Sequence, residues 1–212
     1  MNRDKVFIYW DNSNIFHEAQ RLAEERDATP GARYLVRIHF ENILRLAQAD
    51  RKIERAVAAG SIPPEMRQLW NRMENNDVEV KLLERGLMGG GEQGMPDHYL
   101  QLQMLKHLAE YNGAPGIVVL LTGDGAGYGR GEGFHSTLEL MHKKGWKVEI
   151  LSWAHACNQR MRRWAEANGV FVALDDFYES VTFRAPSSPG HEFAEARKET
   201  PLDLNRRRVS QQ

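Results

Sequence analysis

The chain has 212 residues and a hydrophobic fraction of 42%, enough for one folded domain of about 180 residues and a tail. Its 28 Lys and Arg residues against 29 Asp and Glu residues give a net charge of -1, which excludes a generally basic nucleic-acid-binding chain. The single cysteine excludes an intramolecular disulfide, and no apolar run approaches the roughly 20 residues that span a bilayer. We therefore expect a cytoplasmic protein with no signal peptide and no membrane partner.

Strand-like and helix-like segments alternate along the chain. The expected strands comprise residues 6–10, 53–62, 78–83, 116–121, 146–151 and 169–174. The expected helices comprise residues 12–25, 35–48, 96–111, 134–144 and 157–168, with another beginning at 63 and a short element over 177–183. Such alternation is typical of a parallel sheet with helices on both faces. The sequence therefore predicts a three-layer α/β/α fold with a central, mostly parallel sheet.

A change of composition marks the end of the predicted domain. From Pro186 onward, Ser, Pro and Gly residues are followed by many charged residues. We expect residues 1–184 to form the domain and residues 185–212 to be a flexible, charged C-terminal tail. The sequence leaves the oligomeric state open, including a homo-oligomer.

Acidic residues follow three of the apolar strands. Asp11, Asp124 and the pair Asp175 and Asp176 come after the first, fourth and sixth expected strands. In open parallel sheets the ligand site lies outside the carboxyl ends of the strands, so these carboxylates are expected at one edge. Carboxylate oxygens are the ligands that Mg²⁺ or Mn²⁺ prefers. Asn14, one turn after Asp11, is expected to hydrogen-bond that carboxylate or to hold a phosphate.

Asp97 begins a predicted helix, and it follows the glycine-rich stretch 86–94. Because this helix comes after the third strand, Asp97 is expected at the same edge. A second glycine-rich stretch, 123–133, would overhang the same cleft as a lid and bring Glu132 into it. Two simpler interpretations stay open. Asp97 would then only stabilise the first turn through the helix dipole, and the second glycine stretch would be a flexible surface loop.

A local basic segment supports a nucleic-acid partner. Within about one and a half helical turns lie Arg160, Arg162, Arg163 and Trp164. We predict that Arg160 and Arg163 contact phosphates, which supplies affinity without sequence specificity. The alternative is a solvated basic helix face. The cluster at 206–208 would add to the basic surface if the tail docks.

Three motifs and one isolated acid occur in a specific order. They are Val-Phe-Ile-Tyr-Trp-Asp-Asn-Ser-Asn at 6–14, Leu-Leu-Thr-Gly-Asp-Gly at 120–125, Val-Ala-Leu-Asp-Asp-Phe at 172–177, and Asp97. Together they resemble the NYN domains, a branch of the PIN-like nuclease superfamily, over residues 4–183. The resemblance implies a parallel sheet of strand order 3-2-1-4-5, a bound divalent metal and hydrolysis of RNA phosphodiester bonds.

The resemblance also implies which residues form the site. They are Asp11, Asp97 and Asp124 for catalysis, the same three with Asp176 for the metal, and Asn14 and Thr122 for the substrate. We therefore predict an endoribonuclease that depends on Mg²⁺ or Mn²⁺ and acts on RNA.

Two positions depart from the family pattern and keep alternatives open. The family often has a second acid two residues after the acid that Asp124 matches, where this chain has Ala126. A Lys-Gly pair before the helix-opening acid is replaced by Gln-Gly-Met-Pro at 93–96. The first alternative is a catalytically weakened RNA- or nucleotide-binding module on the same fold. The second is a phosphotransfer enzyme with Asp11 as nucleophile, although the second acid it would need is absent at Ser13.

Overall fold

The six predicted apolar strands form one sheet in the computed structural model, which describes residues 4–27, 31–61, 71, 74, 78–83, 95–126, 128–184 and 200–209. The strands are β1 (Lys5–Asp11), β3 (Lys52–Ser61), β4 (Glu79–Leu83), β5 (Ile117–Leu121), β6 (Lys147–Ser152) and β7 (Val170–Ala173). Their order is β4-β3-β1-β5-β6-β7, and all neighbours are parallel. Numbered within this sheet, the order is 3-2-1-4-5-6, which confirms the predicted order and adds the sixth strand at its edge.

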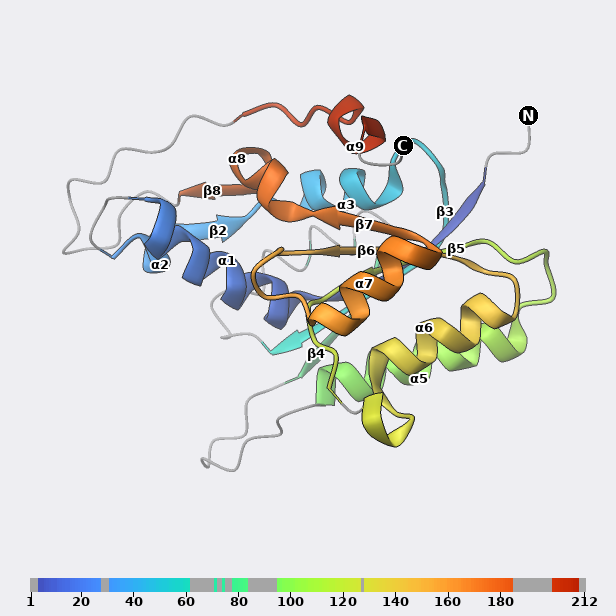
Figure 1. Ribbon diagram of the computed structural model, residues 1–212. Coiled ribbons are helices and arrows are strands. Elements are labelled where there is room, and N and C mark those ends of the chain that lie inside the picture. Colours follow the sequence, from blue (N-terminus) through green and yellow to red (C-terminus); the bar gives the residue numbers. More distant parts are fainter. Residues whose placement is uncertain are drawn as a thin grey trace.

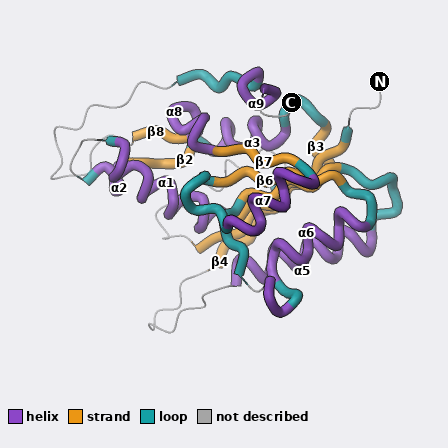
Figure 2. The backbone as a smooth tube through the Cα atoms, viewed as in Figure 1, coloured by secondary structure: helices purple, strands orange, loops and turns teal. Residues whose placement is uncertain are grey.

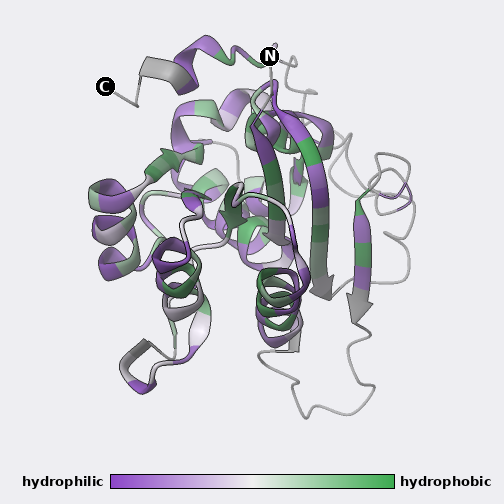
Figure 3. Ribbon diagram, turned by 90° about the vertical axis from the view of Figure 1, so that its right-hand side faces the viewer, coloured by the Kyte–Doolittle hydropathy of each residue, from purple (hydrophilic) through white to green (hydrophobic). Residues whose placement is uncertain are grey.

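Helices cover both faces of the sheet, as predicted (Figure 1). One face carries α1 (Asn12–Arg26), α2 (Ala32–Leu35), α3 (Phe40–Gln48) and α8 (Tyr178–Val181). The other carries α5 (Met95–Glu110), α6 (Gly133–Lys143) and α7 (Gln159–Asn168). These helices contain both apolar and polar residues, as helices with one buried and one exposed face require (Figure 3). No helix in the described ranges is long and apolar enough to cross a membrane.

The central strand β1 contributes to two cores because successive side chains of a strand point to opposite faces. Val6, Ile8 and Trp10 pack beneath α1 and α3, whereas Phe7 and Tyr9 pack against α5 and α6. This burial on both faces explains why the strand is continuously apolar until it reaches its carboxyl end.

The predicted helix over 35–48 is wrong at its start. Residues Val36–Ile38 form β2, which pairs antiparallel with β8 (Thr182–Arg184) in a second, small sheet. The predicted short element over 177–183 is a 3-10 turn η3 (Leu174–Phe177) followed by α8 and β8. This pairing joins segments far apart in sequence, so local periodicity does not reveal it. The predicted helix at 63 and the glycine stretch 86–94 lie outside the described residues, apart from positions 71 and 74.

Residues 200–209, expected to be part of a flexible tail, pack on the domain beside α8 (Figure 2). Ser180 donates a hydrogen bond from Oγ to the Pro201 carbonyl at 3.1 Å. The short helix α9 (Asn205–Val209) then buries Arg207, which is 3% exposed and forms an ion pair with Glu149. These residues thus belong to the folded unit, and Arg207 is not available to a nucleic acid. The rest of the predicted tail lies outside the described residues.

Candidate active site

Three of the predicted acids come together where the chain changes direction across the sheet. The chain first builds outward from β1 through β3 to β4 and then continues on the other side of β1 with β5. Such a switch point opens a crevice at the carboxyl ends of the strands. Asp11 is the last residue of β1, Asp124 follows β5, and Asp97 lies in the first turn of α5. The carboxyl group of Asp97 lies close enough to those of Asp11 and Asp124 to perturb its pKa through both. We call these three residues the acidic triad.

Asp11 is held in a fixed orientation. It is 3% exposed and is the N-cap of α1. The Asn14 backbone N–H donates to its Oδ1 at 3.1 Å, and the Thr122 hydroxyl donates to its Oδ2 at 3.1 Å. With both carboxylate oxygens bound, the side chain keeps one rotamer toward the crevice.

Asp124 is oriented by the turn in which it lies. Its backbone N–H donates to the Thr122 hydroxyl at 3.2 Å. The Ala126 backbone N–H donates to Asp124 Oδ1 at 2.8 Å. Thr122 is fully buried and links the two acids, because its single hydroxyl donates to Asp11 and accepts from Asp124. A chain position without a carboxylate, Ala126, thus still contributes to the site through its backbone.

The turn after β5 forms hydrogen bonds with α1 on one face of the sheet and with the N-cap of α7 on the other. Asn14 of α1 accepts the Gly123 N–H on its side-chain Oδ1 at 2.8 Å. Asn158 donates its backbone N–H to the Gly123 carbonyl at 2.9 Å. Gly125 has no room for a side chain, since a Cβ there would lie 2.4 Å from Asn158 Cγ. Asn14, predicted to act on Asp11 or on substrate, therefore positions the turn through its side chain.

Asn158 is a site residue that the sequence analysis missed. Its Oδ1 accepts the backbone N–H groups of Arg160 and Met161, which makes it the N-cap of α7. An asparagine just before a helical segment is a recognisable capping signal. Its second contact, with Gly123, depends on the packing of two loops and has no local signal.

Burial and mutual repulsion set the electrostatics of the triad. Burial, together with the charge of Asp124, raises the pKa of Asp11, and hydrogen bonds from Asn14 and Thr122 oppose the increase. Burial and the charges of Asp11 and Asp124 raise the pKa of Asp97 from 3.8 to about 8. At neutral pH, one proton on Asp97 therefore relieves the repulsion among three carboxyl groups.

The three carboxyl groups suit Mg²⁺ or Mn²⁺ as ligands. A bound cation would neutralise the repulsion among the carboxylates, which in its absence is relieved by the proton on Asp97. Within the ranges that the structure covers, no group of three or more His, Cys, Asp or Glu side chains already encloses a metal position. Both oxygens of Asp11 and one of Asp124 accept hydrogen bonds from the protein. Chelation would therefore require small side-chain rotations, with Asp97 losing its proton.

We expect the chelator-treated protein to become less stable as the pH rises from about 4 to about 8. Within this window the folded state retains a proton on Asp97, whose pKa is about 8, whereas the unfolded chain has released it near the ordinary value of 3.8. The stabilisation is complete below the unfolded pKa and disappears as pH rises through the folded pKa. Melting temperatures in EDTA across this range measure the slope, which Asp97→Asn should reduce. An unchanged slope in Asp97→Asn would contradict the assignment.

Helix α1 contacts the segment that carries the final acidic pair. It begins at Asn12, directly after Asp11. Arg26 at its end donates to the Asp175 carbonyl at 3.2 Å. Asp175 Oδ1 also lies 4.0 Å from His155, which pairs with Glu18 in the first half of α1 at 3.3 Å.

Asp175, the first acid of the final pair, contacts both the segment after β6 and α1. Asp175 accepts the Ala154 N–H on Oδ2 at 2.6 Å, and its Oδ1 lies 3.9 Å from Arg26 Nη2. Asp176 is exposed on η3, and no contact joins it to the triad in the part of the chain that the structure describes. That Asp176 assists in holding the metal stays a prediction.

The predicted basic residues lie on α7, whose N-cap contacts the turn that carries Asp124. Arg160 is in the first turn of α7, directly after the Asn158 cap that contacts Gly123, and both Arg160 and Arg163 are exposed. Arg162 instead binds Glu166 and lies over the Phe171 ring.

Comparison with known proteins identifies the family and the fold of the domain. The family model described as NYN domain matches residues 5–172, a range that contains the whole triad and ends before Asp175. Comparison with curated proteins gave no match. Among solved structures, the crystal structure of a protein of unknown function from Vibrio parahaemolyticus is similar, with a TM-score of 0.60 and 18% sequence identity. The alignment covers 82% of this chain and 95% of that chain. At this identity the similarity shows a shared fold alone.

Proposed function

We propose that this chain, which belongs to the NYN domain family of the PIN-like nuclease superfamily, is a divalent-metal-dependent endoribonuclease. One observation carries the proposal: three carboxyl groups from separate elements meet at the switch point of the sheet, and one of them has a pKa near 8. Perturbed acids gathered in a crevice are typical of catalytic sites. A set of carboxylates without a nucleophilic Ser or Cys favours metal-assisted hydrolysis of a phosphodiester over acyl transfer.

In this proposal Asp11, Asp97 and Asp124 hold Mg²⁺ or Mn²⁺. A bound cation would polarise a phosphodiester oxygen and lower the pKa of a coordinated water. Thr122, predicted to bind substrate, is fully buried, so we assign it the positioning of Asp11. Asn14 likewise positions the turn that carries Asp124.

RNA would approach along α7. Arg160 and Arg163 are exposed on this helix and would pair with backbone phosphates. Such contacts orient a strand without reading its bases, so we expect weak sequence preference and strong dependence on salt. The only cysteine, Cys157, is a buried free thiol, which fits the reducing cytoplasm that we propose as its location.

The test is cleavage of a pool of structured and single-stranded RNA in Mn²⁺, in Mg²⁺ and in EDTA. We expect internal cleavage with either metal and none with the chelator. RNA binding without cleavage in any metal would instead support the alternative of a binding module on the same fold. The replacement of an acid by Ala126 is the observation that keeps this alternative in the test.

A further inference from the structure

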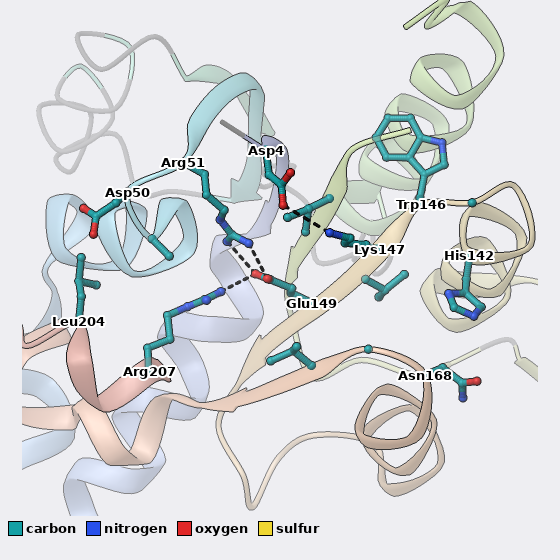
Figure 4. Close-up of a pocket in the computed structure, with 16 residues that line it drawn as sticks. Asp4, Asp50, Arg51, His142, Trp146, Lys147, Glu149, Asn168, Leu204 and Arg207 are labelled. Carbon is teal, nitrogen blue, oxygen red and sulfur yellow. Dashed lines mark hydrogen bonds and ion pairs between the residues drawn. The ribbon is translucent and has the colours of Figure 1, made fainter. Parts of the chain in front are cut away.

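A pocket of about 540 Å³ lies at the amino ends of the strands, the edge opposite the acidic triad (Figure 4). Asp4, just before β1, lines it, whereas Asp11 ends the same strand. Seven extended residues separate the two edges by about 23 Å. The pocket combines the start of β6, the turn after α3 and the docked segment 200–209. It is therefore distinct from the proposed RNA-cleavage site.

Two arginines converge on one carboxylate in this pocket (Figure 4). Arg51 donates from Nη1 and Nη2 to the two oxygens of Glu149 at 2.5 and 2.8 Å, a bidentate pair. Arg207 of α9 reaches the same carboxylate from the other side. The side chains of all three are largely removed from solvent, at 16%, 7% and 4% exposed for Arg51, Glu149 and Arg207. The buried cluster thus holds two positive charges and one negative charge.

The remaining charges of the pocket do not balance this excess. Lys147 pairs with Asp4 at 3.4 Å, and both side chains are more than half exposed, so this pair is neutral as a unit. Asp50 is exposed at the rim. Water and salt screen an exposed charge much more than a buried one, so Asp50 offsets little of the inner positive charge.

Arg207 is the residue with unused binding capacity. Arg51 also donates to the carbonyls of Gln48 and Ala47, so its guanidinium is well satisfied. The Arg207 Nε is buried and has no hydrogen-bond partner among the described residues. A buried guanidinium with an unsatisfied N–H is costly, and an anion would reduce this cost.

We infer that this pocket binds a small anion that carries a phosphate or carboxylate group, with Arg207 as its main contact. The volume lies within the range of small-molecule sites and is large enough for a molecule of mononucleotide size. The turn that presents Arg51 follows the left-handed C-cap of α3, Ala49, with φ of 48°.

The first experiment measures the melting temperature of the full chain in EDTA, which prevents anions from binding through a metal at the triad. Inorganic phosphate, a nucleoside monophosphate and succinate are titrated separately, with chloride at the same ionic strength as the control. We expect a saturable increase in the melting temperature with the phosphate compounds, with succinate, or with both. The compounds that raise it identify whether the pocket recognises a phosphate or a carboxylate group. No saturable increase with any of them would overturn the proposal.

Variants then locate the site by isothermal titration with the active anion. Arg207→Gln should weaken binding by about tenfold or more, the loss of one charge-assisted hydrogen bond. Asp50→Asn removes the rim charge without touching the buried cluster and should strengthen binding about two- to threefold. Asp124→Asn is the matched control and should leave binding unchanged. Unaltered affinity in both pocket variants would overturn the assignment, and this result does not depend on whether the protein cleaves RNA.

Discussion

Asp124→Asn should reduce metal-dependent RNA cleavage by about a thousandfold or more. The substitution keeps the shape of the side chain, and the amide oxygen can still accept the Ala126 N–H. What is lost is one carboxylate charge at the proposed metal position. Metal-assisted catalysis supplies several kcal/mol to the transition state, and each 1.36 kcal/mol is about a tenfold change in rate. Initial rates on labelled RNA at saturating Mn²⁺ measure the effect, and RNA binding should persist.

The chain provides a matched control in the acidic pair that follows β7. Asp176→Asn removes an equivalent charge from the carboxyl edge, but that residue is exposed and has no described contact with the triad. We expect it to cleave at the rate of the wild type. If Asp124→Asn remained fully active, the catalytic assignment would fail. An equally large loss in Asp176→Asn would instead support the sequence-based prediction that this residue holds the metal.

Glu149→Ala should lower the free energy of unfolding by about 3–5 kcal/mol, the largest stability effect we expect from one substitution. The change leaves Arg51 and Arg207 buried and facing each other without a carboxylate. It would also remove one attachment of segment 200–209, since Arg207 joins this segment to β6. Urea unfolding followed by tryptophan fluorescence measures the loss.

A surface ion pair serves as the comparison. Lys5 and Glu54 lie 3.1 Å apart but are 39% and 25% exposed, so Glu54→Ala should cost less than about 1 kcal/mol. Similar losses in the two variants would show that the Glu149 cluster is not the buried anchor described here. Replacing Arg51, Glu149 and Arg207 together by apolar residues should recover much of the stability, because no unpaired charge then stays buried.

The pH dependence of this cluster has a definite sign. Burial alone would raise the pKa of Glu149, but hydrogen bonds and charges from Arg51 and Arg207 outweigh it and lower the pKa below 4.5. The cluster therefore contributes its stability above the ordinary glutamate pKa and loses it as the pH falls through the lower folded value. This direction is opposite to that of Asp97.

Much of the site could be predicted from local sequence. Each strand of the main sheet is a short apolar run, and Asp11 and Asp124 stand where two of these runs stop. In a parallel sheet the carboxyl ends of the strands share one edge, so chain order alone brought these acids together. Asp97 was predictable for the same reason, since it begins the helix that returns from β4.

Contacts between segments that are distant in the sequence could not be predicted from local sequence. Asp175 and Asp176 follow a strand just as Asp11 does, yet Asp175 accepts the Ala154 N–H and lies close to Arg26, contacts that no local pattern indicates. Arg207 was expected in a free tail, but it meets Glu149, which is 58 positions earlier in the chain. Hydrophobic periodicity reports which face of an element is buried, whereas the partner of a charged side chain depends on how whole elements pack. The order of strands and acids in the sequence thus determined at which edge of the sheet the acids lie. Only the tertiary structure decided which arginine is buried and which charged residues it contacts, because these contacts depend on the packing of whole elements.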